Sequence, residues 1–215
     1  SYLDTCNPSL NAVTPFHYSS ADPPNSLDQA NIRYFVDAPG RFDENYDVWI
    51  AHVASGPTDN THSDPDTPSL EYNAKCLAKQ LAKVYQDNPQ QITLVAHSMG
   101  GPVSRACIAQ NYDGCRDKVS RLFTLGSPHA GLPHKDWAEF FNEVNAQPGL
   151  IELIGNNIVP FNRNNPNRVL VSYVFIGGDI WGYDPLAGGD GVVGKYSALG
   201  WTDSRGNTDP PRWDT

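Results

Sequence analysis

One segment constrains the fold of this chain more than any other: an apolar run followed at once by a turn of small residues and a helix. Residues 92–96 (ITLVA) form a continuous apolar stretch, which is typical of a parallel strand buried on both faces. The turn SMGG follows directly, and residues 102–110 have helical character. We therefore expect a strand, a sharp turn and a helix between residues 92 and 110.

The alternation of strand and helix extends along the chain. A helix is expected from Thr67, which can cap it, with Pro68 in its first turn and Asn88 and Pro89 at its end. Its apolar positions fall on one face: Leu70, Ala74, Leu77, Leu81 and Val84. Strands are expected at residues 32–36, 47–53, 122–125 and 169–176, and mainly helix at 137–154. This order predicts an α/β fold, a mostly parallel sheet flanked by helices.

Composition divides the chain into three segments. Residues 1–46 begin with an irregular stretch rich in Ser, Pro, Asn and Asp, residues 47–200 carry the α/β core, and residues 201–215 form a polar C-terminal loop. A chain of 215 residues is long enough to bury one good core. No apolar run approaches the roughly 18 residues of a membrane span, so we expect no transmembrane segment.

Charge and cysteine content limit the partners and the compartment. A net charge of -9 argues against nucleic-acid binding, which needs clustered Lys and Arg. The even count of four cysteines favours an oxidising, secreted setting, with free thiols in a cytosolic enzyme as the alternative. Their spacing does not suggest a structural zinc site. Of three pairings, Cys107 with Cys115 is favoured because a helix end and a Gly-containing turn can return the chain.

The hexapeptide AHSMGG carries the strongest chemical signal. It is a variant of the GxSxG nucleophile elbow in which Ala96 replaces the first glycine. A tight turn here exposes the Ser98 hydroxyl as a nucleophile and directs the Met99 N–H at a developing oxyanion, aided by the helix dipole. The alternative is a serine that merely caps the following helix.

Three segments, AHSMGG, LFTLGSPHAG and GGDGVVGKYSALG, together resemble the signatures of secreted bacterial lipases and related esterases of the α/β-hydrolase superfamily. The resemblance covers roughly residues 47–200. It implies a carboxylic ester hydrolase that needs no cofactor or metal and acts on an ester or lipid-like small molecule through an acyl-enzyme on Ser98. It also implies Asp190 as the triad acid, with Asp179 as the rival position and a simple turn as the alternative for Asp190.

The catalytic histidine is missing from its expected place. In this fold the histidine follows the acid, and no histidine follows Asp190. The adjacent histidine and glycine pair that the family has after an early strand, as the second oxyanion donor, is also missing upstream of Asp47. We therefore expect both groups to lie outside these 215 residues, as would any secretion signal, so that the fold is incomplete at both ends.

Other histidines leave two alternatives open. His17 or His62 could serve as the base, whereas His97 and His129 occupy positions that line the site in the family without acting as base. If no base is supplied, the chain is a catalytically inactive hydrolase-like domain that binds a ligand. A thioesterase or amidase on the same fold is a further alternative, because all three reactions share the elbow chemistry.

A helical insertion at about residues 133–166 is expected to cover the site as a lid. Apolar residues recur at helical spacing along 137–154, which suits acyl chains and transient contact with a lipid surface. An ordinary helix packed in the core would show the same period. The acidic loop with Asp59, Asp64 and Asp66 lacks a recognisable calcium-binding spacing.

Overall fold

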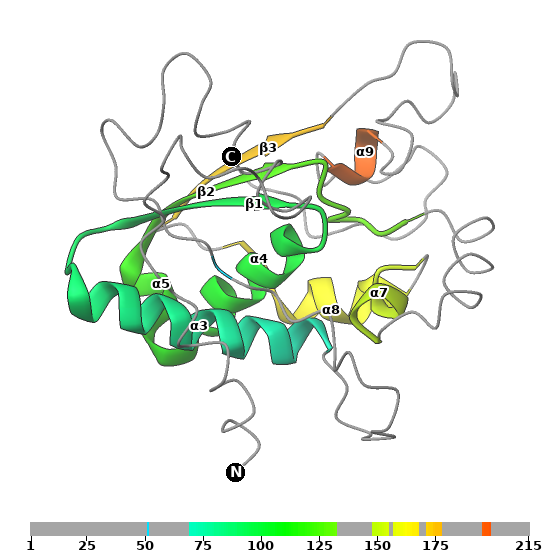
Figure 1. Cartoon of the computed structure of the whole chain (residues 1–215). Coiled ribbons are helices and arrows are strands. Elements are labelled where there is room, and N and C mark those ends of the chain that lie inside the picture. The colour runs from blue at the N-terminus through cyan, green and yellow to red at the C-terminus, as the bar shows by residue number, and fades with distance from the viewer. Residues whose placement is uncertain are drawn as a thin grey trace, which may run out of the picture. The chain divides into compact units, whose positions relative to one another are not determined.

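The computed structural model describes residues 51, 69–132, 148–154, 157–167, 171–177 and 195–198 (Figure 1). The chain separates into two compact units, residues 1–52 and 53–215, and nearly all described residues belong to the second. The predicted strands at 32–36 and 47–53 and the C-terminal loop at 201–215 lie outside the described residues. Ala51 is the exception, and it is exposed and belongs to no regular element.

A parallel sheet forms the centre of the described structure. Its strands are β1 (Ile92–His97), β2 (Val119–Leu125) and β3 (Ser172–Ile176), and they pair in the order β1-β2-β3. Both pairings are parallel, which confirms the predicted sheet. Strand β2 begins three positions earlier than the LFTL segment indicated, because Val119 pairs with Ile92 at the start of the ladder.

Helices connect and cover these strands. The described helices are α3 (Leu70–Asp87), α4 (Gly100–Gln110), η3 (Tyr112–Gly114), α5 (Cys115–Lys118), α7 (Pro148–Glu152), α8 (Ile158–Asn164) and α9 (Lys195–Ala198). Figure 1 shows α3, α4 and α5 along one face of the sheet. Helix α4 links β1 to β2 as predicted, starting two residues before Pro102, so strand, turn and helix follow one another directly.

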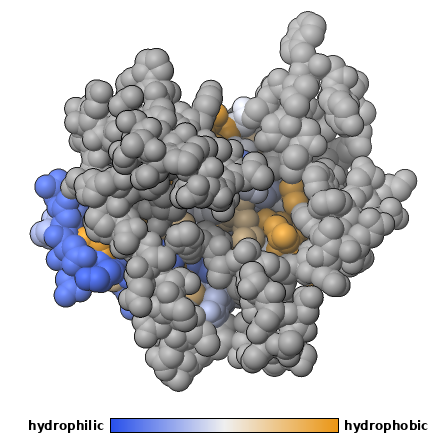
Figure 2. Space-filling view, viewed as in Figure 1, coloured by the Kyte–Doolittle hydropathy of each residue, from blue (hydrophilic) through white to orange (hydrophobic). Residues whose placement is uncertain are grey.

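Helix α3 has the amphipathic face that the sequence predicts. Its five predicted apolar positions are buried, and the helix ends before Asn88. Its outer face carries ion pairs at 2.8 and 2.9 Å between Lys75 and Glu71 and between Lys83 and Asp87. Figure 2 shows hydrophilic residues where the C-terminal part of this helix reaches the surface. The prediction that Thr67 caps this helix is wrong. The N-cap is Ser69, whose Oγ accepts a hydrogen bond of 3.0 Å from the Tyr72 N–H, and the helix starts at the next residue, Leu70.

The prediction that β1 is buried on both faces is wrong. Exposure alternates along the strand, with Ala96 8% and Val95 51% exposed. Val174 and Ile176 of β3 are similarly exposed, at 40% and 47%. The helices α3 and α4 pack on one face of the described sheet. The apolar run therefore predicted the strand correctly, but it did not predict which of its faces is buried.

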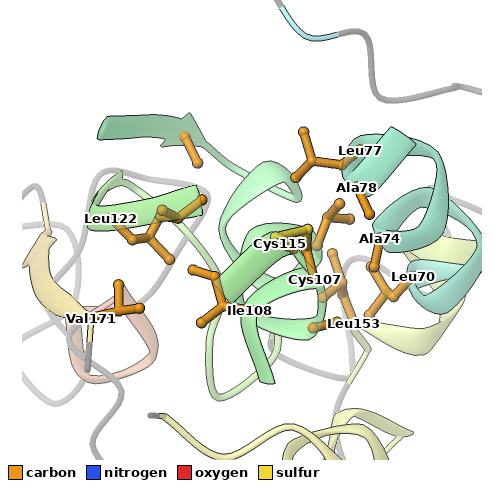
Figure 3. Close-up of a cluster of buried hydrophobic side chains, with 14 of the residues drawn as sticks. Leu70, Ala74, Leu77, Ala78, Cys107, Ile108, Cys115, Leu122, Leu153 and Val171 are labelled. Carbon is orange, nitrogen blue, oxygen red and sulfur yellow. A yellow bond between two sulfur atoms is a disulfide. The ribbon is translucent and has the colours of Figure 1, made fainter. Parts of the chain in front are cut away.

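The core lies between α3, α4 and the sheet (Figure 3). It contains the following buried hydrophobic residues, among others: Leu70, Ala74, Leu77, Val103, Ala106, Ile108, Leu122 and Leu153. Burial of each large aliphatic side chain contributes roughly 1.5–3 kcal/mol, so this cluster stabilises the packing of α4 on the sheet.

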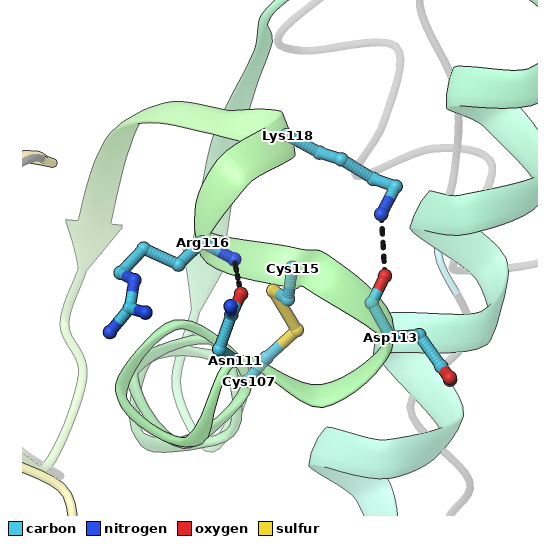
Figure 4. Close-up of a disulfide and its surroundings, with 6 residues drawn as sticks. All are labelled: Cys107, Asn111, Asp113, Cys115, Arg116 and Lys118. Carbon is cyan, nitrogen blue, oxygen red and sulfur yellow. Dashed lines mark hydrogen bonds between the residues drawn. A yellow bond between two sulfur atoms is a disulfide. The ribbon is translucent and has the colours of Figure 1, made fainter.

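A disulfide joins Cys107 to Cys115 and confirms the favoured pairing (Figure 4). The two Cα atoms are 5.9 Å apart, within the usual range for a disulfide. The chain reverses between them through Asn111, which has φ 54° and accepts a hydrogen bond of 2.9 Å from the Arg116 N–H. Cys76 is also disulfide-bonded, so the described cysteines are not free thiols.

The described part of the predicted lid is anchored in the core. Leu153 and Ile154 are buried at 1% and 6% exposure, and Ile154 pairs with Leu132. The Glu152 carboxylate accepts a hydrogen bond of 3.0 Å from the Leu70 N–H at the start of α3. These residues match the alternative interpretation, a helix packed in the core, whereas residues 133–147 lie outside the described residues. Across the helices that are described, none has the length and apolar character to cross a membrane.

Candidate active site

Ser98 lies on the turn between β1 and α4 in a conformation that serine rarely adopts. Its φ is +51°, in the left-handed region that costs an L-residue roughly 1–2 kcal/mol. Two backbone hydrogen bonds hold the turn: the Ser98 N–H donates to Leu125 O at 3.2 Å, and the Gly101 N–H donates to Ser98 O at 3.1 Å. Ser98 itself is half-buried. Strain of this kind persists where surrounding structure fixes it, and it is concentrated at functional sites.

The glycines after Ser98 allow α4 to start close to its neighbours. A Cβ on Gly101 would overlap Ser127 Oγ and lie 2.5 Å from Ser127 Cβ and 3.0 Å from His129 Cε1, so only glycine fits there. A Cβ on Gly100 would lie 3.6 Å from the Ala96 Cβ, an ordinary contact. Ala96 therefore fits where the usual motif has glycine, and the requirement for the smallest residue falls on Gly101.

Met99 is the residue between Ser98 and the first turn of α4. Its backbone is helical, with φ -54° and ψ -25°, and its carbonyl accepts a hydrogen bond of 3.2 Å from the Val103 N–H. Its own N–H thus belongs to the helix end where backbone donors converge and the helix dipole is positive. A backbone N–H at a helix N-terminus is the kind of donor that can stabilise an oxyanion.

The other predicted groups are not brought to this turn by the described structure. Asp190, Asp179, His17 and His62 lie outside the described residues, as does the acidic loop. His97 is exposed at the end of β1. In the part of the chain that is described, no cluster of three or more His, Cys, Asp or Glu side chains could hold a metal ion.

His129 is fully buried rather than facing a site surface. Its Nδ1 lies 3.3 Å from Arg105 Nη1, and its Nε2 lies 3.0 Å from Thr124 Oγ1. A guanidinium can only donate, so Nδ1 accepts and the ring proton sits on Nε2, which donates to Thr124. Burial, and then the charge of Arg105, hold the pKa of His129 well below its usual value. The ring is therefore neutral.

Arg105 is the charged centre of a buried polar network that the sequence analysis missed. It is 1% exposed and donates to Asn162 Oδ1 at 3.1 Å and to Asn165 O at 2.9 Å. Burial lowers the pKa of its guanidinium to about 9, so it stays charged at neutral pH. Its signal was present in the sequence, because Arg105 is the one charged residue in the otherwise apolar and small stretch GGPVSRACIA.

The loop after β2 also holds α9. The His129 N–H donates to Ser197 O at 3.1 Å, and the Ala130 N–H donates to Ser197 Oγ at 3.2 Å. Ser197 Oγ in turn donates to Gly131 O at 2.6 Å. Helix α9 follows Asp190 closely in sequence, so these bonds tie the segment after the predicted acid to the loop that packs on the start of α4.

Substitution of Gly100 and of Gly101 by alanine should affect the stability of the protein differently. Gly101→Ala should lower the free energy of unfolding by about 1–3 kcal/mol, because its methyl group overlaps Ser127. Gly100→Ala is the matched control and should be neutral or slightly stabilising. Adding Ser127→Gly should restore part of the stability lost in Gly101→Ala, measured by urea unfolding. Equal stability of the two single variants would contradict the close approach at Gly101.

Acidification should destabilise the native protein through His129. Its pKa is depressed on folding, so below about pH 6.5 the unfolded chain binds a proton that the folded chain excludes, and stability is lost as pH falls. The stability advantage of the wild type over His129→Asn should shrink by up to about 1.4 kcal/mol per pH unit below that point. Urea unfolding of both proteins between about pH 8 and about pH 5 measures it. A constant difference would mean that the folded protein also binds the proton.

Comparison with known proteins adds a family to this geometry. The sequence pattern of the family described as "PGAP1-like alpha/beta domain" matches residues 65–172, about half of the chain, from just before α3 to the start of β3. The match therefore includes Ser98, Arg105 and His129. No curated protein matches the sequence of this chain.

Two solved structures of the Bacillus licheniformis lipase BlEst2 are similar to the chain. The propeptide form matches at 23% identity with a TM-score of 0.52, covering 61% of this chain and 34% of that one. The mature form matches at 23% identity with a TM-score of 0.45, covering 53% and 49%. The chain thus spans half or less of the length of these structures. The match to the propeptide form and the parallel sheet with flanking helices support the predicted α/β-hydrolase fold. Because the family pattern covers half of the chain, the chain belongs to the PGAP1-like alpha/beta domain family.

Proposed function

We propose that this protein is a carboxylic ester hydrolase that acts through an acyl-enzyme on Ser98. One observation carries the proposal: Ser98 has a positive φ on a tight turn between a parallel strand and a helix N-terminus. A serine that merely capped α4 would not need this conformation, since a capping residue adopts extended backbone. Family membership and the α/β-hydrolase fold support a hydrolase, and the likeness to a lipase favours an ester substrate.

The chemistry follows from the position of Ser98. Its Oγ attacks the ester carbonyl carbon, a base takes the hydroxyl proton, and the carbonyl oxygen becomes negatively charged. The Met99 N–H stabilises that oxyanion, together with the dipole of α4. Collapse of the tetrahedral intermediate releases the alcohol with a proton from the base, and water then attacks the acyl-enzyme to release the acid.

The remaining triad members are assigned as part of the proposal. Asp190 is the acid, with Asp179 as the rival, and the resemblance of the GGDGVV segment to the lipase signature supports the first. His129 does not serve as the base, because its ring is buried, neutral and engaged with Arg105 and Thr124. The base is a histidine outside the described residues, or one supplied from outside this sequence.

An inactive hydrolase-like binding domain is the second candidate. It is favoured because His129, the described histidine that is buried against α4, is engaged with Arg105 and Thr124 and is not available as a base. A thioesterase or amidase would use the same elbow, so the ester assignment depends on the likeness to lipases.

A disulfide-bonded chain with a lipase-like fold is also compatible with secretion and with substrates at a lipid surface.

Loss of the Ser98 hydroxyl should abolish ester hydrolysis without unfolding the protein. Ser98→Ala should reduce kcat/KM on p-nitrophenyl esters by about 1,000-fold or more, because the covalent step is lost. Ser120→Ala is the matched control, since Ser120 lies at the opposite end of β2 and should retain full activity. Hydrolysis by Ser98→Ala at the wild-type rate would exclude the proposal, and no turnover by the wild type would favour the binding domain.

The two candidate acids can be separated in the same assay. Asp190→Asn should lower kcat by about 10,000-fold, because the amide cannot stabilise the imidazolium, whereas Asp179→Asn should retain most of the activity. Thermal unfolding of both variants checks that each remains folded. The reverse pattern would assign the acid to Asp179.

A further inference from the structure

We propose that the buried pair Arg105 and His129 is the positioning device of the active site, which holds the Ser98 turn and helix α9 at a fixed separation. This inference deepens the proposed hydrolase function and rests on it. Neither side chain touches the substrate in this proposal: both act through the elements that they join.

The pair is the point where the elements that carry the site meet. Through its ring, His129 contacts Arg105 of α4, Thr124 of β2 and, edge-on at 4.6 Å between ring centroids, Phe175 of β3. Through its backbone, the His129 carbonyl accepts from Asn162 Nδ2 of α8 at 2.8 Å, and its N–H donates to Ser197 O of α9 at 3.1 Å. One residue therefore connects both strands and all three helices named here.

The network acts on Ser98 through direct contact with the start of α4. Gly101, whose N–H donates to the Ser98 carbonyl, lies against Ser127 and the Cε1 edge of His129. Any rotation of the imidazole would move that edge toward or away from Gly101. The orientation of the ring is thus transmitted to the turn that gives Ser98 its positive φ.

Arg105 fixes the ring in one orientation because its guanidinium has several donors in a rigid plane. Nη1 reaches both His129 Nδ1 and Asn162 Oδ1, and Nη2 reaches Asn165 O at 2.9 Å. With Nδ1 accepting from Arg105, the ring proton sits on Nε2 and is donated to Thr124. A ring flipped about the Cβ–Cγ bond would place carbon atoms where these two nitrogens now bond, so both hydrogen bonds would be lost. A lysine at position 105 would place its three donors on one freely rotating nitrogen, so it would not fix the ring as the planar guanidinium does.

The chain offers an intrinsic probe of this geometry. Met99 is the single methionine, and it lies directly after Ser98 while packing against the core. Labelling with [methyl-13C]methionine therefore gives one NMR signal that reports on the turn without requiring catalysis. The rate at which a fluorophosphonate labels Ser98 gives a second, chemical readout of the same turn.

The test compares His129→Asn and Thr124→Val with the control Gln110→Ala in the full chain. Gln110 Nε2 also links α4 to the α8 region, through Asn165 Oδ1 at 3.1 Å, but at the far end of α4 from Ser98. Thr124→Val keeps the side-chain shape and removes the acceptor for the His129 ring. The two network variants should shift or split the Met99 signal and slow Ser98 labelling by about 10- to 100-fold. Gln110→Ala should change neither.

Each outcome bears on one claim. A folded Thr124→Val or His129→Asn protein with the wild-type Met99 signal and labelling rate would overturn the inference, as would the same changes in Gln110→Ala. If His129→Asn fails to fold, Thr124→Val decides. If the wild-type protein is not labelled, the proposed hydrolase function fails, whereas the Met99 signal still tests the positioning of the turn.

Discussion

The positive φ of Ser98 depends on how closely the start of α4 approaches the loop after β2. A left-handed serine is unfavourable by roughly 1–2 kcal/mol, and the turn keeps it only because its neighbours allow no relaxed alternative. On one side, the Ser98 N–H is bonded to Leu125 at the end of β2. On the other, Gly101 lies so close to Ser127 that a single added carbon would overlap it. The left-handed conformation of Ser98 is the product of these two restraints.

Beneath this turn the protein uses a buried polar network where an apolar core would also fill the space. Burying the Arg105 charge is costly unless it is hydrogen-bonded, and here Nη1 and Nη2 donate to His129, Asn162 and Asn165. In return, hydrogen bonds have directions, whereas hydrophobic contacts tolerate rearrangement. The network therefore specifies one arrangement of α4, α8 and the loop after β2, while the aliphatic cluster around Leu122 and Ile108 supplies stability. In α4, the apolar side chains such as Ile108 therefore stabilise the fold, whereas Arg105 fixes the position of the helix relative to α8 and the loop after β2.

The sequence predicted those features that depend on local pattern. The turn at Ser98, the parallel strands, the inner face of α3 and the pairing of Cys107 with Cys115 all follow from residue spacing within one segment, and the structure has them. Features set by distant segments were missed or wrong. The exposure of Val95 on β1 was not predicted, because no local signal says which elements cover the second face of a strand. The cap of α3 is Ser69 and not Thr67, as the predicted start was two residues too early. The role of Arg105 depends on Asn162 and Asn165, far along the chain, so no spacing rule could reveal it.

The strain at Ser98 can be measured directly by comparing the unfolding free energies of Ser98→Gly and Ser98→Ala. Both variants lack the hydroxyl, so the comparison isolates the backbone. Glycine adopts a φ of +51° without penalty, whereas alanine pays the same cost as serine. If the turn is held in the left-handed conformation, Ser98→Gly should be more stable than Ser98→Ala by about 1 kcal/mol. At an unstrained position the order reverses, because glycine loses more conformational entropy on folding. A Ser98→Ala protein as stable as Ser98→Gly, or more stable, would therefore contradict a strained nucleophile turn at Ser98.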